Sequence, residues 1–362
     1  MAITNLKLKI EATLVTPMTQ IESSEQRPNK NKPGEKVNIT TVKTRAVLDD
    51  KYGIVKLPIY TGNGFRGLLR RKMSEIILEK ALKKGIKPTR DDYYFMVAGG
   101  GANYQKQDFD VVEKVRFLNP VISVLGTSLA VPGKLIVTDL LPVNYDSYLY
   151  EYRRREEDFE DEDNYNKAQN WGCSLIKTLT FSKKDDVLDQ TKFGRFISPE
   201  DVKAWEKFME NETSEEGKER KTIRSFLSKE YVVPGTKFRG FIGSKEPLTE
   251  IEYGLVLKGL MDLTNENLGA GAANGFGVAN YNIYSSIDEK EIISSLVNER
   301  FILERTVESP KSEYEKHCIF EFEKWLENLT DANINVSGLM KSTEKKKAEK
   351  NIKKSKNQAA EA

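Results

Sequence analysis

The chain has 362 residues, of which 38% are hydrophobic and 31% are charged, so it can bury a sizeable core and is not disordered throughout. Its 57 Lys and Arg against 55 Asp and Glu give a formal charge of +2, but residues 341–362 alone hold eight Lys and three Glu. Residues 1–340 therefore carry 49 basic and 52 acidic side chains. A site for a polyanion must be a local patch, because the body of the chain is not globally basic.

Cysteine, histidine and long apolar runs are scarce. Only Cys173 and Cys318 occur, far apart, which excludes a disulfide scaffold and a cysteine zinc site and favours the reducing cytosol. His317 is the single histidine, so zinc chemistry of the HExxH kind is excluded and a Ser-His-Asp triad would have to use it. No apolar run reaches the length of a membrane span, and residues 1–14 alternate instead of forming a signal-peptide core. We expect a cytoplasmic protein with no metal, no cofactor and no membrane contact.

The first elements in chain order are a strand, a long polar segment and a helix. Apolar and polar residues alternate over 6–14, which predicts a half-buried strand. Residues 16–41 are polar and proline-containing, and indicate a long loop or a mobile hairpin. A short extended piece, 54–60, leads into the glycine-rich turn 61–67, and apolar residues at helical spacing then predict a helix over 68–84.

The middle of the chain is predicted to be β-structure followed by an insertion. Residues 111–143 are assigned to strands, with a turn at Asn119-Pro120. The charge run 150–166 has no apolar stripe and indicates a solvated segment of a variable insertion over 144–230.

Regular structure is expected to resume after the insertion. Thr249 and Glu252 form a capping box that opens an apolar helix. A glycine loop at 268–277 and a strand over 278–284 follow. Helices separated by strands in this order predict an α+β, ferredoxin-like sheet with helices on one face.

The C-terminal part is predicted to be helical and then disordered. Ser312 and Glu315 are expected to cap an amphipathic helix within a helical extension over 286–336. The Lys-rich tail 337–362 is expected to be disordered.

A GxGxxG motif precedes the first predicted helix. Gly62, Gly64 and Gly67 match the dinucleotide-binding pattern, but no acidic residue ends the next strand. The turn is repeated at 235–240 with Lys237 where the middle glycine would stand, so the repeat does not carry the motif. A nucleotide-dependent enzyme remains an alternative that would require Gly64.

A basic helix start is the more informative feature. Arg66, Arg70, Arg71 and Lys72 lie where the helix dipole favours acids. Together with backbone N–H groups at the helix start, they predict a phosphate-binding site. The alternative is a solvated basic face. The second glycine loop is either a tight packing turn or part of such a site.

Three segments in order resemble the RAMP superfamily of CRISPR-associated proteins. Residues 58–70 resemble the family's glycine-rich helix start, residues 117–127 with 133–139 resemble its "N-P-(L/V)-x-x-L-F-G … G-x-L-x-(V/I)-x-D" pair, and residues 268–278 resemble its C-terminal glycine loop. The resemblance covers residues 1 to about 285 and is closest to the backbone protein of type IV systems, then to that of type I.

The resemblance implies an RRM-like palm made of residues 1–143 and 231–285, with inserted finger and thumb subdomains. It implies a non-catalytic backbone subunit that binds guide RNA (crRNA) and oligomerises along it as a helical filament. Its partners would be copies of itself, other effector subunits and the target strand paired to the guide. The alternative is a RAMP endoribonuclease, but the early loop 18–44 contains no Asp to cleave RNA.

The resemblance also implies the RNA-contacting residues, which belong to the early loop, the helix start, the insertion and the glycine loop. They are Lys43, Arg45, Asn63, Gly64, Phe65, Arg66, Arg70, Arg71, Lys183, Lys184, Lys192, Arg195, Gly269, Gly271, Asn274 and Gly275.

Overall fold

The chain folds into two compact units in a computed structural model. The residues that the structure describes are 5–28, 36–49, 53–100, 104–127, 130–143, 175–184, 198–201, 203, 224–285, 290–298, 304–308, 310 and 312–340. Unit 1 comprises Met1–Gln20, Lys43–Leu175 and Val232–Ala362, and unit 2 comprises Ile21–Val42 and Ile176–Tyr231. Both contain strands and unit 1 also contains helices, so the predicted α+β class is confirmed.

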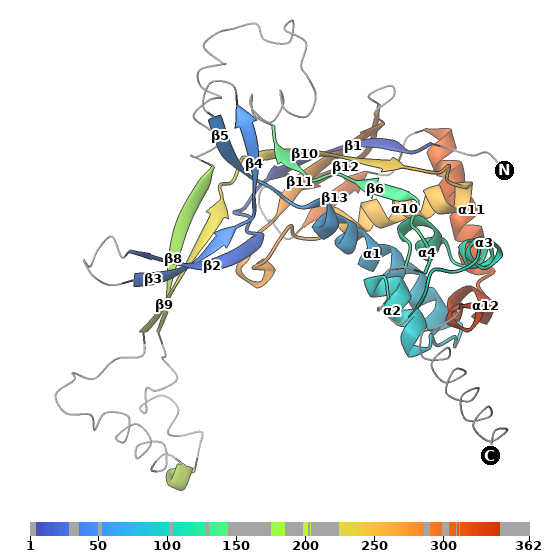
Figure 1. The fold of residues 1–362 in the computed structure, drawn as a ribbon, viewed down its shortest axis with the longest axis horizontal. Helices are drawn as coiled ribbons and strands as arrows, with labels where there is room; N and C mark the ends of the chain where they lie inside the picture. Colours follow the sequence, from blue (N-terminus) through green and yellow to red (C-terminus); the bar gives the residue numbers. More distant parts are fainter. Residues whose placement is uncertain are drawn as a thin grey trace, which may run out of the picture. The chain divides into compact units, whose positions relative to one another are not determined.

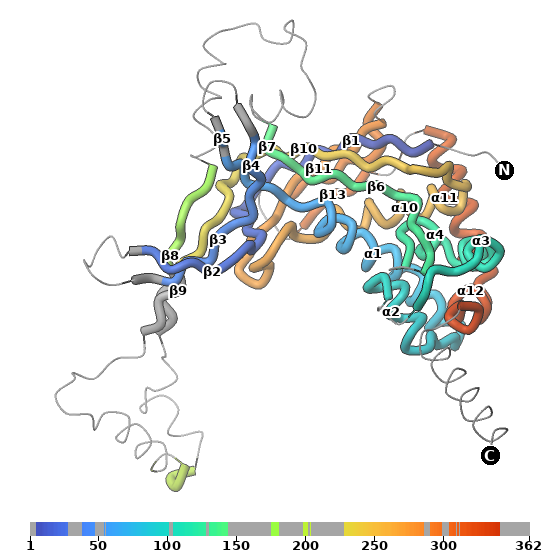
Figure 2. The backbone as a smooth tube through the Cα atoms, viewed as in Figure 1, coloured from blue at the N-terminus to red at the C-terminus, as the bar shows by residue number. Residues whose placement is uncertain are grey.

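Unit 1 is built on a seven-stranded antiparallel sheet (Figure 1). Its strands are β1 (Lys7–Leu14), β6 (Leu135–Val137), β7 (Leu141–Pro142), β10 (Lys237–Ser244), β11 (Ala279–Ser285), β12 (Glu291–Val297) and β13 (Arg305–Glu308). The order is β13-β12-β11-β1-β10-β6, and β7 also pairs with β10, next to which Figure 2 draws it. A separate antiparallel hairpin joins β4 (Thr44–Asp49) to β5 (Gly53–Pro58).

The central strand β1 shows why the sheet has one covered face. Leu8, Ile10 and Ala12 are at most 2% exposed and point to the core. Between them on the other face lies Glu11, which accepts hydrogen bonds from Arg239 Nε and Nη2 at 3.0 and 2.7 Å. Burial raises the pKa of this carboxyl, but the hydrogen bonds from Lys237 and Arg239 outweigh it and hold the pKa below its usual range.

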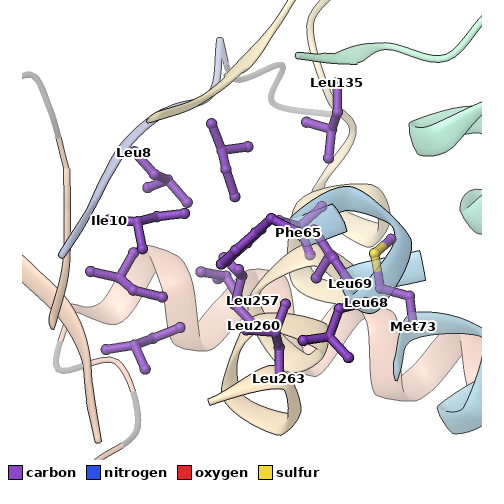
Figure 3. Close-up of a cluster of buried hydrophobic side chains, with 14 of the residues drawn as sticks. Leu8, Ile10, Phe65, Leu68, Leu69, Met73, Leu135, Leu257, Leu260 and Leu263 are labelled. Atoms are coloured by element: carbon purple, nitrogen blue, oxygen red, sulfur yellow. The ribbon is translucent and has the colours of Figure 1, made fainter. Parts of the chain in front are cut away.

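Helices gather on the covered face of this sheet (Figure 1). They are α1 (Gly62–Lys83), α2 (Arg90–Ala98), α3 (Phe109–Leu118), α4 (Pro120–Leu125), α10 (Glu250–Leu263), α11 (Glu313–Glu327) and α12 (Asp331–Ile334), with short 3-10 helices at Ala272–Asn274 and Ser337–Leu339. Phe65 and Leu69 of α1 and Leu257 of α10 are completely buried in the core between helices and sheet (Figure 3). The α10 and α11 backbones approach so closely that a Cβ on Gly254 would lie 2.1 Å from the Cys318 carbonyl oxygen.

Unit 2 is a four-stranded sheet, and the polar segment 16–41 contributes to two of its strands. Its order is β2 (Ile21–Pro28), β3 (Lys36–Val42), β9 (Arg224–Val232) and β8 (Ile176–Lys184). β2 and β3 form an antiparallel hairpin, so the hairpin interpretation is correct, and β3 runs parallel to β9. Glu230 of β9 links this strand to β2 and β3, because it accepts hydrogen bonds from Arg27 Nη1 at 2.7 Å and from the Val42 amide at 3.2 Å.

The predicted β-structure over 111–143 is wrong in its first half, which forms α3 and α4. Val112 and Val115, one helical turn apart, are the buried residues of α3. Asn119-Pro120 is a helix start and not a turn, because the Asn119 side chain accepts from the Ile122 amide at 3.1 Å and proline takes the first helical position.

Two boundaries also differ from the prediction. The first helix begins at Gly62, six residues before its expected start, because Thr61 caps it. The expected helical extension over 286–336 opens with β12 and β13, which lengthen the sheet before α11. Ser312 precedes α11 but its side chain makes no capping hydrogen bond. The capping box of Thr249 and Glu252 is confirmed. The charge run 150–166 and residues 341–362 lie outside the described residues.

The same substitution should have opposite effects at two helical glycines. Gly254→Ala places a methyl group against the α11 backbone, so we expect a loss of about 1–3 kcal/mol in the free energy of unfolding. Gly67→Ala meets only Arg71 Nη1 at 3.7 Å, and we expect a gain of about 0.5–1 kcal/mol from helix propensity. Urea denaturation of both variants measures the pair, and equal effects would contradict the close packing of α10 on α11.

Candidate nucleic-acid interface

The first turn of α1 is satisfied by groups of the protein itself. The Gly64 amide donates to Thr61 Oγ1 at 3.1 Å, and the Thr61 amide donates to Gln20 Oε1 at 2.8 Å. The Gly62 amide donates to Asp139 Oδ1 at 2.7 Å, and Arg45 pairs with the other oxygen of that carboxylate. The expectation of free N–H groups for a phosphate is therefore wrong for Gly62 and Gly64. Asp139 supplies the negative charge that this helix end favours.

The glycine loop 268–277 is anchored at both ends and open at its tip. The Ala270 amide donates to the Thr19 carbonyl and the Gly277 amide to the Pro17 carbonyl, both at 2.7 Å. A Cβ on Gly269 would lie 2.3 Å from the Thr19 carbonyl oxygen, and Gly269 also has a positive φ of 83°. The packing-turn interpretation therefore accounts for the anchors.

The tip of that loop is a different environment. Ala272, Ala273 and Asn274 are exposed in one turn of 3-10 helix. A Cβ on Gly275 would meet nothing within 4 Å. Packing does not explain the tip, so it is free to contact a ligand.

Tyr60 connects the glycine loop to the start of α1. Its side chain is 5% exposed. Burial raises the pKa of the Tyr60 hydroxyl, against the opposing effects of the Arg71 charge and of a hydrogen bond to the Gly269 backbone. Gln20 braces the same place because its Nε2 donates to Thr61 Oγ1 at 2.8 Å. Tyr60 thus links the glycine loop to the start of α1.

Two of the predicted contact residues, Arg70 and Phe65, are turned into the protein. Arg70 donates to the carbonyls of Phe95, Gly126 and Leu125 at 3.1, 2.9 and 2.7 Å. Burial and the charge of Arg66 lower the pKa of Arg70 to about 10. Phe65 is completely buried. Neither side chain is available to RNA in this structure, because each is used to pack α1.

Arg66 has the same structural partner as Arg70. Its Nη2 donates to the Leu125 carbonyl, and its buried Nε has no hydrogen bond to any residue that the structure describes. Burial lowers the pKa of its guanidinium. The two arginines together hold the carboxyl end of α4, so the prediction of direct phosphate contact does not fit Arg66 either.

The residues left at the surface are fewer than predicted. Asn63, Arg71 and Asn274 are exposed and Lys43 is half-buried. Arg71 makes no hydrogen bond or ion pair within the described part of the chain, and its Nη1 lies 3.7 Å from the Cβ position of Gly67, so its side chain runs back toward the start of α1. Lys43, Asn63, Arg71 and Asn274, with the backbone of Gly64, Gly269, Gly271 and Gly275, are called the cluster below.

The remaining predicted residues lie elsewhere or cannot be placed. Lys183 and Lys184 end β8 in unit 2, where the structure describes the strand but not their side chains. Lys192 and Arg195 lie outside the described residues. Arg45 is engaged by Asp139.

The sequence pattern missed Gln20, Tyr60 and Asp139 as parts of this region. Tyr60 and Asp139 belong to the segments that carry the family resemblance, which was the available signal. Gln20 lies in the polar segment with nothing to distinguish it.

Groups that would suit other chemistry are not assembled here. Among the residues that the structure describes, no three His, Cys, Asp or Glu side chains are grouped so that they could hold a metal ion. His317 is exposed on α11, with Nε2 3.7 Å from Glu250 Oε1. In the described parts, no helix is long and apolar enough to cross a membrane.

Comparisons with known proteins found a likeness in structure but none in sequence. No protein-family model matches the sequence, and no curated protein matches it. The fold is similar to a chain of a solved structure described as "Type IV-B CRISPR Complex", with a TM-score of 0.44 and 14% sequence identity. The match covers 78% of this chain and 91% of that chain. Similarity at this level is too low to assign the chain to a family.

Removing the Asp139 carboxylate should loosen the start of α1. Asp139→Ala removes the acceptor of the Gly62 amide and the carboxylate that faces Arg45, so we expect a loss of about 1–3 kcal/mol in the free energy of unfolding. Asp139→Asn keeps an acceptor oxygen for the amide and should lose less. Chemical denaturation of both variants checks this order, and a wild-type midpoint for Asp139→Ala would contradict it.

Proposed function

We propose that the chain is a non-catalytic, guide-RNA-binding backbone subunit of a CRISPR effector complex. One observation carries the proposal: the three segments of the family resemblance converge on the amino-terminal half of α1. Arg70, within the first segment, is bonded to Leu125 and Gly126 of the second. Asp139, which ends the second segment, holds Gly62, and Tyr60 of the first contacts Gly269 of the third.

The topology of unit 1 supports an RRM-like palm. Six of its elements occur in the chain order β1, α1, β6, β10, α10 and β11, which is the β-α-β-β-α-β succession of a split βαβ fold, with β4, β5, α2, α3, α4 and β7 inserted between them. The four strands lie side by side in the order β11-β1-β10-β6, all antiparallel, with β12 and β13 added at one edge. Helices on one face of this sheet complete the arrangement that a RAMP palm requires (Figure 1).

Recognition of RNA would fall on the exposed part of the cluster. Arg71 and Lys43 supply positive charge for phosphates, Asn63 supplies an amide, and the tip of the glycine loop supplies exposed backbone. Contacts of this kind position a strand without reading its bases. A subunit that must accept any guide sequence needs such contacts.

Assembly along RNA follows from the same proposal. Each copy would bind an equivalent stretch of guide, so copies would meet head to tail through a heterologous interface that does not close. Other effector subunits and the target strand paired to the guide are the further partners. His317 lies on α11, with Nε2 3.7 Å from Oε1 of Glu250 on α10, and is not among the residues of the cluster, which supports a scaffold over the endoribonuclease alternative.

Co-expression with a CRISPR array tests this function. We expect guide-length RNA to co-purify with oligomers of the chain, measured by the absorbance ratio of nucleic acid to protein and by sequencing. Arg71→Ala should lower RNA affinity uniformly across guide sequences and reduce the salt slope of binding by about one. Lys245→Ala removes an exposed cation outside the cluster and serves as the matched control.

Two outcomes would overturn the proposal. One is an RNA-free monomer of the wild type with and without the array. The other is cleavage of RNA by the purified chain that His317→Ala abolishes, which would establish the endoribonuclease instead.

A further inference from the structure

A basic corner lies where α1 ends and α2 begins, at the opposite end of α1 from the cluster described above. A helix of 22 residues is about 33 Å long, so the two surfaces are well separated. In α2, Arg90, Tyr93 and Tyr94 have the spacing of one helical face. The other face of α2 packs inward through Phe95 and Met96, which are 1% and 0% exposed.

The cations of this corner divide into two groups. Lys80 and Lys84 have a structural use, because Lys80 pairs with Glu327 and Lys84 Nζ donates to the Leu329 carbonyl at 3.1 Å, after the end of α11. Lys83 and Lys87 are exposed, and neither side chain has a hydrogen bond or ion pair with a described residue. Together with Arg90, they make three cations within eight positions of the chain.

Arg90 and the two tyrosines form the centre of the corner. The Arg90 side chain is 85% exposed, and its ion pair is a long one, 3.7 Å from Nε to Asp91 Oδ1. Tyr93 and Tyr94 are 47% and 54% exposed, with ring centroids 6.3 Å apart and planes at 83°. Leu82, in the last turn of α1, is 68% exposed. Stability of the fold does not account for large rings and cations left together in water.

Cations that surround exposed aromatic rings are the combination that binds single-stranded nucleic acid, because phosphates pair with the cations while unpaired bases stack on the rings. We propose that the basic corner, Lys83, Lys87, Arg90, Tyr93 and Tyr94, is a second binding surface for single-stranded nucleic acid. It is independent of the guide-binding cluster at the start of α1.

The charge of the adjoining chain favours this occupant. Met340 is 3% exposed and packs in the same hydrophobic cluster as Phe95 of α2. The residues that follow it, 341–362, carry eight Lys and three Glu. The chain that follows Met340 thus has a surplus of five positive charges, which favours a polyanion as the ligand.

Binding of fluorescent 12-nucleotide oligouridine and oligothymidine to the full chain tests the proposal, after bound RNA is removed at high salt. The Lys83→Ala, Lys87→Ala, Arg90→Ala triple variant should bind more weakly, with a salt slope lower by about two, since each phosphate contact of a single strand contributes about 0.7. The Tyr93→Ala, Tyr94→Ala variant should lose about fivefold or more in affinity with the slope unchanged. Equal loss with both oligonucleotides indicates a surface for either strand, and loss with one alone identifies RNA or DNA.

Matched variants keep the test specific to the corner. Tyr93→Phe, Tyr94→Phe keeps the rings and should bind as the wild type does, and Lys245→Ala should also leave binding unchanged. A chain ending at Met340 separates the contribution of the tail, and the triple variant should weaken binding in that background too. All the substituted side chains are exposed, so the variants should unfold at the wild-type denaturant midpoint.

The outcomes distinguish this inference from the proposed function. Loss in the triple and tyrosine variants with full binding by Arg71→Ala supports the corner and counts against the guide-binding cluster. Loss in Arg71→Ala alone overturns the corner and leaves the proposed function standing. If the triple variant weakens binding but Tyr93→Ala, Tyr94→Ala does not, the surface takes any polyanion, such as an acidic protein, and the single-stranded assignment is overturned.

Discussion

A buried guanidinium holds the helical layer of unit 1 together. Arg70 donates to carbonyl groups at the carboxyl ends of two other helices, α2 and α4, and so fixes three helices with one planar side chain. The carboxyl ends of helices carry partial negative charge, which this cation neutralises. Arg71, the next residue, then points outward because helical geometry turns neighbours about 100° apart. The exposed cation of the candidate site is thus placed by the buried one.

At the start of α1, too, a charged side chain of the protein itself satisfies the end of a helix. The protein's own carboxylate, Asp139, accepts from the Gly62 amide at the helix terminus and pairs with Arg45. An external phosphate is therefore left to exposed side chains and to the loop tip. The site depends on the sheet edge for this arrangement, because Asp139 follows β6 and precedes β7.

The sequence correctly predicted those elements whose local residue pattern agrees with their place in the packed fold. Alternation identified β1, and the Thr249–Glu252 capping box identified α10. The prediction from sequence failed at α3 and α4, because the pair Asn119-Pro120 is compatible both with a turn and with a helix start. For the candidate site, the sequence pointed to segments that meet at the start of α1 but did not give the direction of each side chain. Arg66, Arg70 and Arg71 look alike in sequence, and only packing against α4 separates the two structural arginines from the exposed one.

The glycine loop has a consequence for how the chain can vary. Its ends are held by backbone hydrogen bonds to Pro17 and Thr19, with no room for a Cβ at Gly269 or Gly277. Its tip, by contrast, has open space around Gly275. We therefore expect insertions and changes of composition to be tolerated between the anchors and not at them. A change in the length or charge of the tip would then alter what the loop contacts without disturbing the sheet beneath it.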